Sequence, residues 1–202
     1  GVIFALEELH RNFSIMVLLP SMAAAFTATI ISRAIFGRAT IFDIPDLQLL
    51  PISYYGIVIL VALASGLAGV IFNWGLLNIG RFYSLPCFKR PVQKIAFALI
   101  CAGILGYFLP EVLGGGNDLI NHLAKAPVSL QLLLIFLAGK LIFTLISYGC
   151  GVPGGFFLPM LVIGALCGSI CAQMLIMLGW IEPAYATNIM VVAMAALFAS
   201  SV

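Results

Sequence analysis

Charged residues are scarce in this sequence. Lysine, arginine, aspartate and glutamate together make up 8% of its 202 residues, whereas a soluble domain carries about 25%. Hydrophobic residues make up 63% of the chain. A soluble fold of this size could not bury so much apolar surface, so the surrounding solvent is expected to be lipid. The composition therefore predicts an integral membrane protein that crosses the bilayer several times.

Histidines, paired cysteines and basic runs are also scarce. The two histidines, His10 and His122, stand far apart, and the five cysteines contain no Cys-x-x-Cys pair. An intramembrane enzyme would need a nucleophile with a base, or a metal cluster, so we expect no enzyme, no metal site and no cofactor. The net charge is only +2, and no run of roughly five to eight basic residues occurs, which argues against a nucleic-acid partner.

The uncharged segments differ in length. Residues 12–32 form a run long enough to span a bilayer, and Pro20 is expected to kink this helix or to mark its start. Residues 47–80 would be about 50 Å long as one helix, against a bilayer core of about 30 Å, so this helix must be tilted or broken. Further apolar segments are expected to be helical at 95–109, 130–148, 156–178 and 185–202. Such uneven helices favour a transporter.

Two polar segments separate these spans. Residues 81–94 hold the densest group of basic residues, which indicates that this loop lies in the cytoplasm. Residues 111–126 are predicted to form a polar re-entrant segment with glycines at 114–116. Asp118 and His122 are expected to lie there in a loop, in contact with solvent rather than with a bound ion.

A glycine-rich break separates two long apolar segments. Residues 149–159 read Gly-Cys-Gly-Val-Pro-Gly-Gly-Phe-Phe-Leu-Pro. Such a break is costly within a bilayer unless it lines a cavity or is buried in protein. A helix that restarts after the break turns its first N–H groups and the positive end of its dipole towards it, which favours an anion. Because Pro159 is tolerated near a helix start, the N–H groups of Phe156 and Phe157 are expected to point inward.

The residues of the break also suggest two other interpretations, a dinucleotide site and a loop for helix packing. Gly149, Gly151 and Gly154 match the Gly-x-Gly-x-x-Gly fingerprint of dinucleotide sites. That fingerprint requires a preceding strand and an acidic residue about 20 positions later, and here an apolar helix is predicted instead. The second interpretation, a loop of small residues that only lets helices pack closely, stays open on the residues alone.

Four segments, taken in order along the chain, match the pattern of one known family. They are residues 1–8 (Gly-Val-Ile-Phe-Ala-Leu-Glu-Glu), Gly114-Gly115-Gly116 with Ile120, Lys140 with Thr144, and the break, where Gly149, Gly151, Gly154, Gly155, Phe157 and Pro159 fit Gly-x-Gly-x-x-Gly-Gly-x-Phe-x-Pro. Cys150 stands where many members have serine. On these residues the chain resembles the ClC family of chloride channels and chloride/proton exchangers.

The resemblance implies an all-α membrane protein of ClC-like inverted-repeat architecture, with tilted and discontinuous transmembrane helices. Residues 1–46 would form the end of the first repeat, and residues 47–202 most of the second. Both ends of the sequence lie in apolar runs, so we expect a partial ClC transmembrane domain that is truncated at both ends and does not conduct by itself.

The resemblance also implies which residues bind chloride. In the family, two backbone amides after the adjacent glycines coordinate a chloride near the middle of the membrane. In this sequence those amides belong to Phe156 and Phe157, with Gly155 and Pro159 completing the chloride-binding segment. This agrees with the anion site that the helix-terminus argument predicts.

The resemblance implies that one glutamate, Glu8, transfers protons. Glu8 matches the internal glutamate that hands over protons in the family's exchangers, and Glu7 would be a surface partner or line the access path. Burial raises the pKa of a carboxyl group, which would let Glu8 cycle between its charged and neutral forms. The alternative is that Glu7 and Glu8 are the solvated end of a helix beside Arg11.

Lys140 is a charge within a predicted span, which makes it a functional candidate. The alternative is a structural role, in which the side chain reaches the membrane interface or forms a salt link there. We favour the structural role.

The implied function is transmembrane chloride transport. The Glu7–Glu8 pair favours chloride/proton antiport over the alternative, a passive voltage-gated chloride channel without proton coupling. Chloride, protons and the lipid bilayer are then the partners, and the resemblance implies a homodimer with residues 12–32 in part of its interface.

Overall fold

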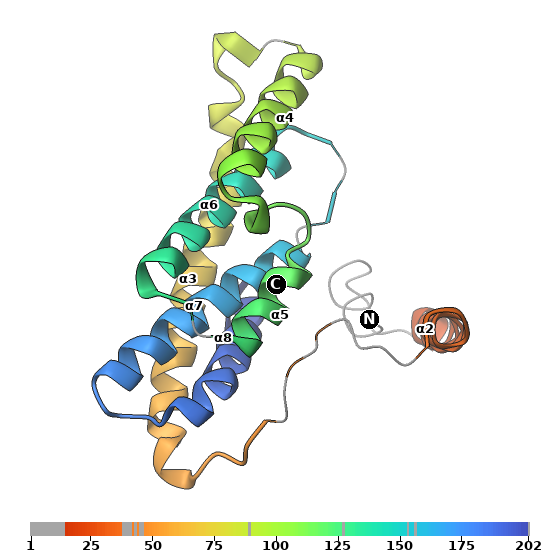
Figure 1. Cartoon of the computed structure of the whole chain (residues 1–202). Coiled ribbons are helices and arrows are strands. Elements are labelled where there is room, and N and C mark those ends of the chain that lie inside the picture. The colour runs from red at the N-terminus through yellow and green to blue at the C-terminus, as the bar shows by residue number, and fades with distance from the viewer. Residues whose placement is uncertain are drawn as a thin grey trace. The chain divides into compact units, whose positions relative to one another are not determined.

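The computed structural model describes residues 15–37, 42, 44, 47–88, 90–126, 128–152, 154–155 and 157–201. These residues include seven α-helices (Figure 1). The helices are α2 (Ile15–Phe36), α3 (Tyr55–Phe82), α4 (Pro91–Phe108), α5 (Asn117–Lys125), α6 (Leu130–Gly149), α7 (Phe157–Met177) and α8 (Ala186–Ser201). Within the described residues, 6 helices are long and apolar enough to cross a membrane. The predicted all-helical, multi-pass architecture is confirmed.

The chain forms two compact units, residues 1–41 with 202, and residues 42–201. In the first unit, α2 continues through Pro20, so this proline neither begins nor ends the helix. The hydroxyl groups of Thr27 and Thr29 donate hydrogen bonds to the carbonyls of Ala23 and Ala25, at 2.8 and 2.7 Å. These bonds satisfy polar side chains on a helix that is otherwise apolar.

Helix α3 is the longest helix of the second unit. It runs unbroken for 28 residues after a short 3₁₀ turn, η2 (Ile52–Tyr54). At 1.5 Å per residue it is about 42 Å long, which exceeds the bilayer core and favours a tilted helix. The alternative of a broken helix is therefore wrong. Gly69 of α3 lies directly against Ser200 and Ser201 of α8, so the two backbones approach closely.

Helices α7 and α8 lie side by side at the centre of this unit (Figure 1). A Cβ atom on Gly164 would lie 2.8 Å from the Cα of Met194, and one on Gly168 would lie 2.7 Å from the Cα of Met190. Only glycine permits this approach, which resembles the small-residue contacts of other membrane helices. The largest buried cluster surrounds α7 and includes Val112, Leu133, Phe136, Val162, Leu166 and Met190.

The polar segment after α4 contains more helix than the sequence predicts. A 3₁₀ turn, η4 (Pro110–Val112), leads into the glycines and then into the 9-residue helix α5. Asp118 and His122 lie on α5 rather than in a loop, because Leu119 and Ile120 bury one face of this helix and hold it in place. Both polar residues are exposed, as expected.

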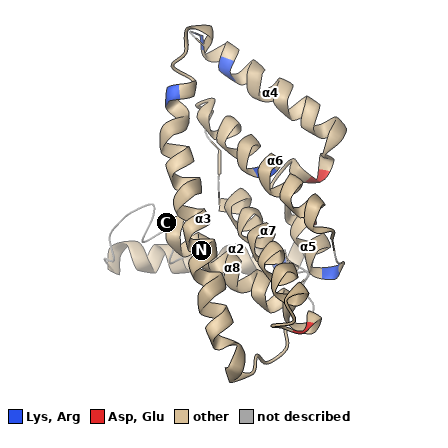
Figure 2. Cartoon of the chain, turned by 90° about the vertical axis from the view of Figure 1, so that its left-hand side faces the viewer, with Lys and Arg blue, Asp and Glu red and all other residues tan. Residues whose placement is uncertain are grey.

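Charged residues of the described part of the chain lie mostly at helix ends and connections, as Figure 2 shows. The basic segment 81–94 is only partly a loop, since Arg81 lies in the last turn of α3 and Lys94 in the first turn of α4. A short 3₁₀ turn, η3 (Pro86–Phe88), joins the two helices. Lys140 is the exception to this distribution, because it lies halfway along α6.

Candidate functional site

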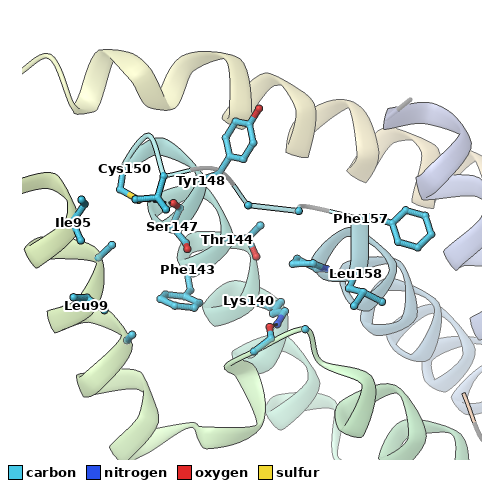
Figure 3. A pocket seen from close by; sticks show the side chains of 18 residues that line it. Ile95, Leu99, Lys140, Phe143, Thr144, Ser147, Tyr148, Cys150, Phe157 and Leu158 are labelled. Carbon is cyan, nitrogen blue, oxygen red and sulfur yellow. Dashed lines mark hydrogen bonds between the residues drawn. The ribbon is translucent and has the colours of Figure 1, made fainter. Parts of the chain in front are cut away.

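A cavity of about 750 Å³ lies beside the glycine-rich break. Apolar residues of α4, among them Ile95 and Leu99, form one wall, and Phe143 and Thr144 of α6 lie on the other (Figure 3). The glycine loop before α5 and the start of α7 complete the lining. The predicted condition for a break within a bilayer, a cavity beside it, is therefore met.

Helix α7 begins at this cavity. Phe157 is its first residue, and Gly155, Phe157 and Pro159 all line the cavity. The phenyl ring of Phe157 packs edge-on against Phe198 of α8, with 5.4 Å between ring centroids. The helix is 21 residues long and has no acidic residue in its first turn, so its positive dipole end meets the cavity without a carboxylate of its own. The helix predicted from residue 156 agrees with α7 from Phe157 onward, and residue 156 itself lies outside the described residues.

The glycines of the break lie in different surroundings. Gly151 has a φ of +83°, and a Cβ atom added to Gly151 or to Gly155 would meet no described atom within 4 Å. Gly149 is different, because its Cβ would lie 2.6 Å from Ile79 and 2.8 Å from the ring of Tyr83. The end of α6 is thus tightly packed, and the segment that follows it is open.

Tyr83 anchors the end of α6. Its side chain is only 2% exposed, and its hydroxyl group donates a hydrogen bond to the carbonyl of Ile146 at 2.9 Å. Burial raises the pKa of Tyr83 to about 12, with smaller contributions from Cys150 and Cys101, so the hydroxyl group remains a donor at neutral pH. Sequence reasoning missed this residue, because only the aromatic pair Phe82–Tyr83 at a helix end marks it.

Lys140 lies deep within α6 and is 1% exposed. Its ammonium group donates hydrogen bonds to the carbonyls of Val112 and Gly114, both at 2.8 Å. Figure 3 shows the side chain beside the glycine loop. The side chain forms no ion pair with a carboxylate of the described residues. Two backbone carbonyls therefore stabilise this buried cation.

Four of the predicted site residues lie around one cavity, namely Gly155, Phe157, Pro159 and Lys140. Phe156, Glu7 and Glu8 lie outside the described residues. The described residues contain no group of three or more His, Cys, Asp or Glu side chains placed to hold a metal ion.

The spans, the interrupted helix and the cavity beside the break define a class, the multi-pass membrane proteins with discontinuous helices. The family model described as voltage gated chloride channel matches residues 1–202, so the chain belongs to this family, the ClC family. The predicted family membership is confirmed.

Curated relatives support the same conclusion. The chain is 32% identical over 177 residues to the H(+)/Cl(-) exchange transporter ClcA of Citrobacter koseri, a match that covers 84% of this chain and 37% of the relative. It is 30% identical over 174 residues to ClcA of Vibrio cholerae, covering 83% of this chain and 37% of the relative. The chain therefore spans little more than a third of the length of these relatives.

Solved structures with the same fold include a slow cyanobacterial Cl⁻/H⁺ antiporter, with a TM-score of 0.83 and 24% identity, covering 98% of this chain and 47% of that one. A CLC-type fluoride/proton antiporter has a TM-score of 0.75 and 25% identity, covering 98% of this chain and 48% of that one. The predicted ClC-like fold is confirmed, whereas the repeat boundary at residues 46 and 47 stays a prediction.

Proposed function

We propose that the protein transports chloride across a membrane and that a chloride ion binds at the start of α7. Gly155, Phe156, Phe157 and Pro159 form the proposed binding segment. One observation carries the proposal, which is that the positive end of a 21-residue helix without a first-turn carboxylate opens into a cavity of about 750 Å³. The relatives named as chloride exchangers support the choice of chloride over other anions.

Backbone dipoles suit an ion that has to leave again. A neutral amide attracts chloride without the strong pairing of a lysine or an arginine, and conduction requires binding that is favourable but reversible. The nearby cation, Lys140, already donates two hydrogen bonds to carbonyls. In this proposal it does not hold the transported ion by direct contact.

Bromide can report the chloride site directly. Crystals of the complete protein soaked in bromide should give an anomalous peak next to the backbone of Phe156 and Phe157. Chloride should displace this peak in a competition soak. An empty map at this position, together with working chloride transport by the same protein, would contradict the proposed site.

We further propose that chloride transport is coupled to protons through Glu8. The exchangers among the relatives support this proposal. In liposomes that contain the complete protein, a chloride gradient should drive protons uphill, and Glu8→Gln should abolish proton movement while retaining part of the chloride flux. Glu7→Gln is the matched control and should keep coupling. Chloride flux without any proton movement in the unmodified protein would instead support a passive voltage-gated channel.

Homodimerisation is part of the proposal, with α2 contributing to the interface. Helix α2 buries none of its residues within its own unit, and Leu19, Phe26 and Ile30 are exposed apolar side chains on it. Counting subunits of the fluorescently labelled complete protein in lipid should give two per particle. A single subunit per particle in a transporting sample would contradict the dimer.

A further inference from the structure

We infer that Lys140 is a positioning residue, which fixes the start of α7 by holding the glycine loop, residues 113–116, against it. The inference rests on the proposed chloride site and adds a residue that sets its geometry. Lys140 donates to two carbonyls of the segment that precedes α5, Val112 O and Gly114 O, both at 2.8 Å. An ammonium group has three donors, so two of them are committed to this segment.

The glycine loop in turn packs on the first turns of α7. A Cβ atom on Gly115 would lie 3.2 Å from Leu158, the second residue of α7. A Cβ atom on Gly116 would lie 2.6 Å from Val162 and 3.3 Å from the Nζ atom of Lys140. The backbone of Gly116 is thus enclosed between the ammonium group on one side and α7 on the other.

The contact continues into the core. Val112 and Val162 are both fully buried and belong to the same apolar cluster. Densely packed interiors transmit displacements rather than absorb them. A shift of the loop away from Lys140 therefore moves the helix turn that begins at Phe157. Lys140 acts through the loop, and its own contact with an anion is not required.

Two variants separate this role from simple attraction of anions by a positive charge. Lys140→Met removes the donors and the charge at similar length. Gly115→Ala keeps the charge and adds a methyl group against Leu158, which displaces the contact between the loop and α7. Gly139→Ala is the matched control, because its Cβ would lie 3.6 Å from Val112, an ordinary contact, on the same turn of α6.

The experiment is chloride and bromide titration of the complete protein by calorimetry, before and after these changes. Lys140→Met and Gly115→Ala should each weaken chloride binding by at least about fivefold, since small misplacements of binding groups have large effects. Both should also change the ratio of bromide to chloride affinity, because a shifted cradle fits ions of different size differently. The double variant Lys140→Met/Gly115→Ala should bind chloride as tightly as the single variant with the lower chloride affinity. Gly139→Ala should bind chloride like the unmodified protein.

The outcomes are distinguishable. Absence of chloride binding in the unmodified protein would refute the proposed function itself. Normal chloride affinity in Gly115→Ala, or an unchanged ion ratio in Lys140→Met, would refute the positioning role while leaving the chloride site intact. Additive effects in the double variant would also refute it. Gly115→Ala keeps the inference testable if Lys140→Met fails to fold.

Discussion

Gly116 of the loop before α5 and Gly155 of the break after α6 serve opposite purposes. In the glycine loop at 113–116, Gly116 is enclosed by Val162 and Lys140, with 2.6 Å from a hypothetical Cβ to Val162. In the break after α6, Gly151 and Gly155 have no described atom within 4 Å of that position. At Gly116 the missing side chain lets the backbone pack against its neighbours. At Gly151 and Gly155 it leaves the backbone accessible.

We expect the packed glycines to matter for stability and the open glycines to matter for anion binding. Side chains at the packed glycines would displace a helix, so their effect should appear in the free energy of unfolding. Side chains at the open glycines would fill space beside backbone amides, so their effect should appear in anion binding. Four substitutions near these segments are expected to change the free energy of unfolding by decreasing amounts, from Gly116→Ala to Gly155→Ala.

Gly116→Ala should have the largest effect on stability. The φ of +87° disfavours alanine, and the added methyl group would overlap with Val162. Left-handed strain of about 1–2 kcal/mol and overpacking of about 1–3 kcal/mol together predict a loss of about 2–5 kcal/mol. Thermal unfolding in detergent measures it. Gly114→Ala is the control, since its φ is +65° but its surroundings are open, and it should lose only the strain component.

Gly149→Ala should be destabilising by about 1–3 kcal/mol through overpacking against Ile79 and Tyr83. Gly149 lies directly before the open part of the break, so this variant tests whether the tight packing of α6 extends to its last residue. Unfolding of the purified protein by denaturant gives the value. Gly80→Ala on α3 serves as the control, because a Cβ there meets nothing within 4 Å and should be neutral or slightly stabilising. Equal losses of unfolding free energy in Gly149→Ala and Gly80→Ala would show that Gly149 is not specially packed.

Tyr83→Phe should cost about 1 kcal/mol, the usual worth of one buried hydrogen bond, here to Ile146. Because the folded-state pKa is raised to about 12 from 10.0, the contribution of Tyr83 is complete below pH 10 and is lost as pH rises through 12. Stability measured between pH 10 and 12 should therefore fall more steeply in the unmodified protein than in the variant. Parallel curves would show that this hydroxyl group is not linked to folding.

Gly155→Ala should leave the unfolding free energy within about 0.5 kcal/mol of the unmodified value, since no atom of the described residues beyond its chain neighbours lies within 4 Å of the new methyl group. Chloride affinity should nevertheless fall at least about fivefold, because the methyl group occupies space beside the proposed amide donors. Unfolding and chloride titration of the same sample measure both quantities. A loss of stability with normal chloride affinity would show that Gly155 matters for packing rather than for anion binding.

The spans could be predicted from the sequence because they contain very few charged residues. The position of α7 could be predicted as well, since the glycines before it and Pro159 near its start mark it directly. Asp118 and His122 were misassigned to a loop, because the short helix α5 depends on tertiary burial of Leu119 and Ile120 rather than on local propensity.

The partners of the buried polar groups could not be predicted. Lys140 bonds to the carbonyls of Val112 and Gly114, and Tyr83 bonds to that of Ile146. Every residue has a backbone carbonyl, so such a partner leaves no mark in the sequence. Only the fold brings these atoms together across 28 and 63 positions of the chain.

The position of Lys140 has a consequence for biosynthesis. A lysine at the centre of a helix adds about 2.5–3.5 kcal/mol to the free energy of inserting that helix into a bilayer. The carbonyls that bind this ammonium group belong to residues made earlier on the ribosome, Val112 and Gly114. Helix α6 is therefore expected to enter the membrane most easily when the segment that contains Val112 and Gly114 is already present to accept these hydrogen bonds, so assembly of this region depends on the order of synthesis.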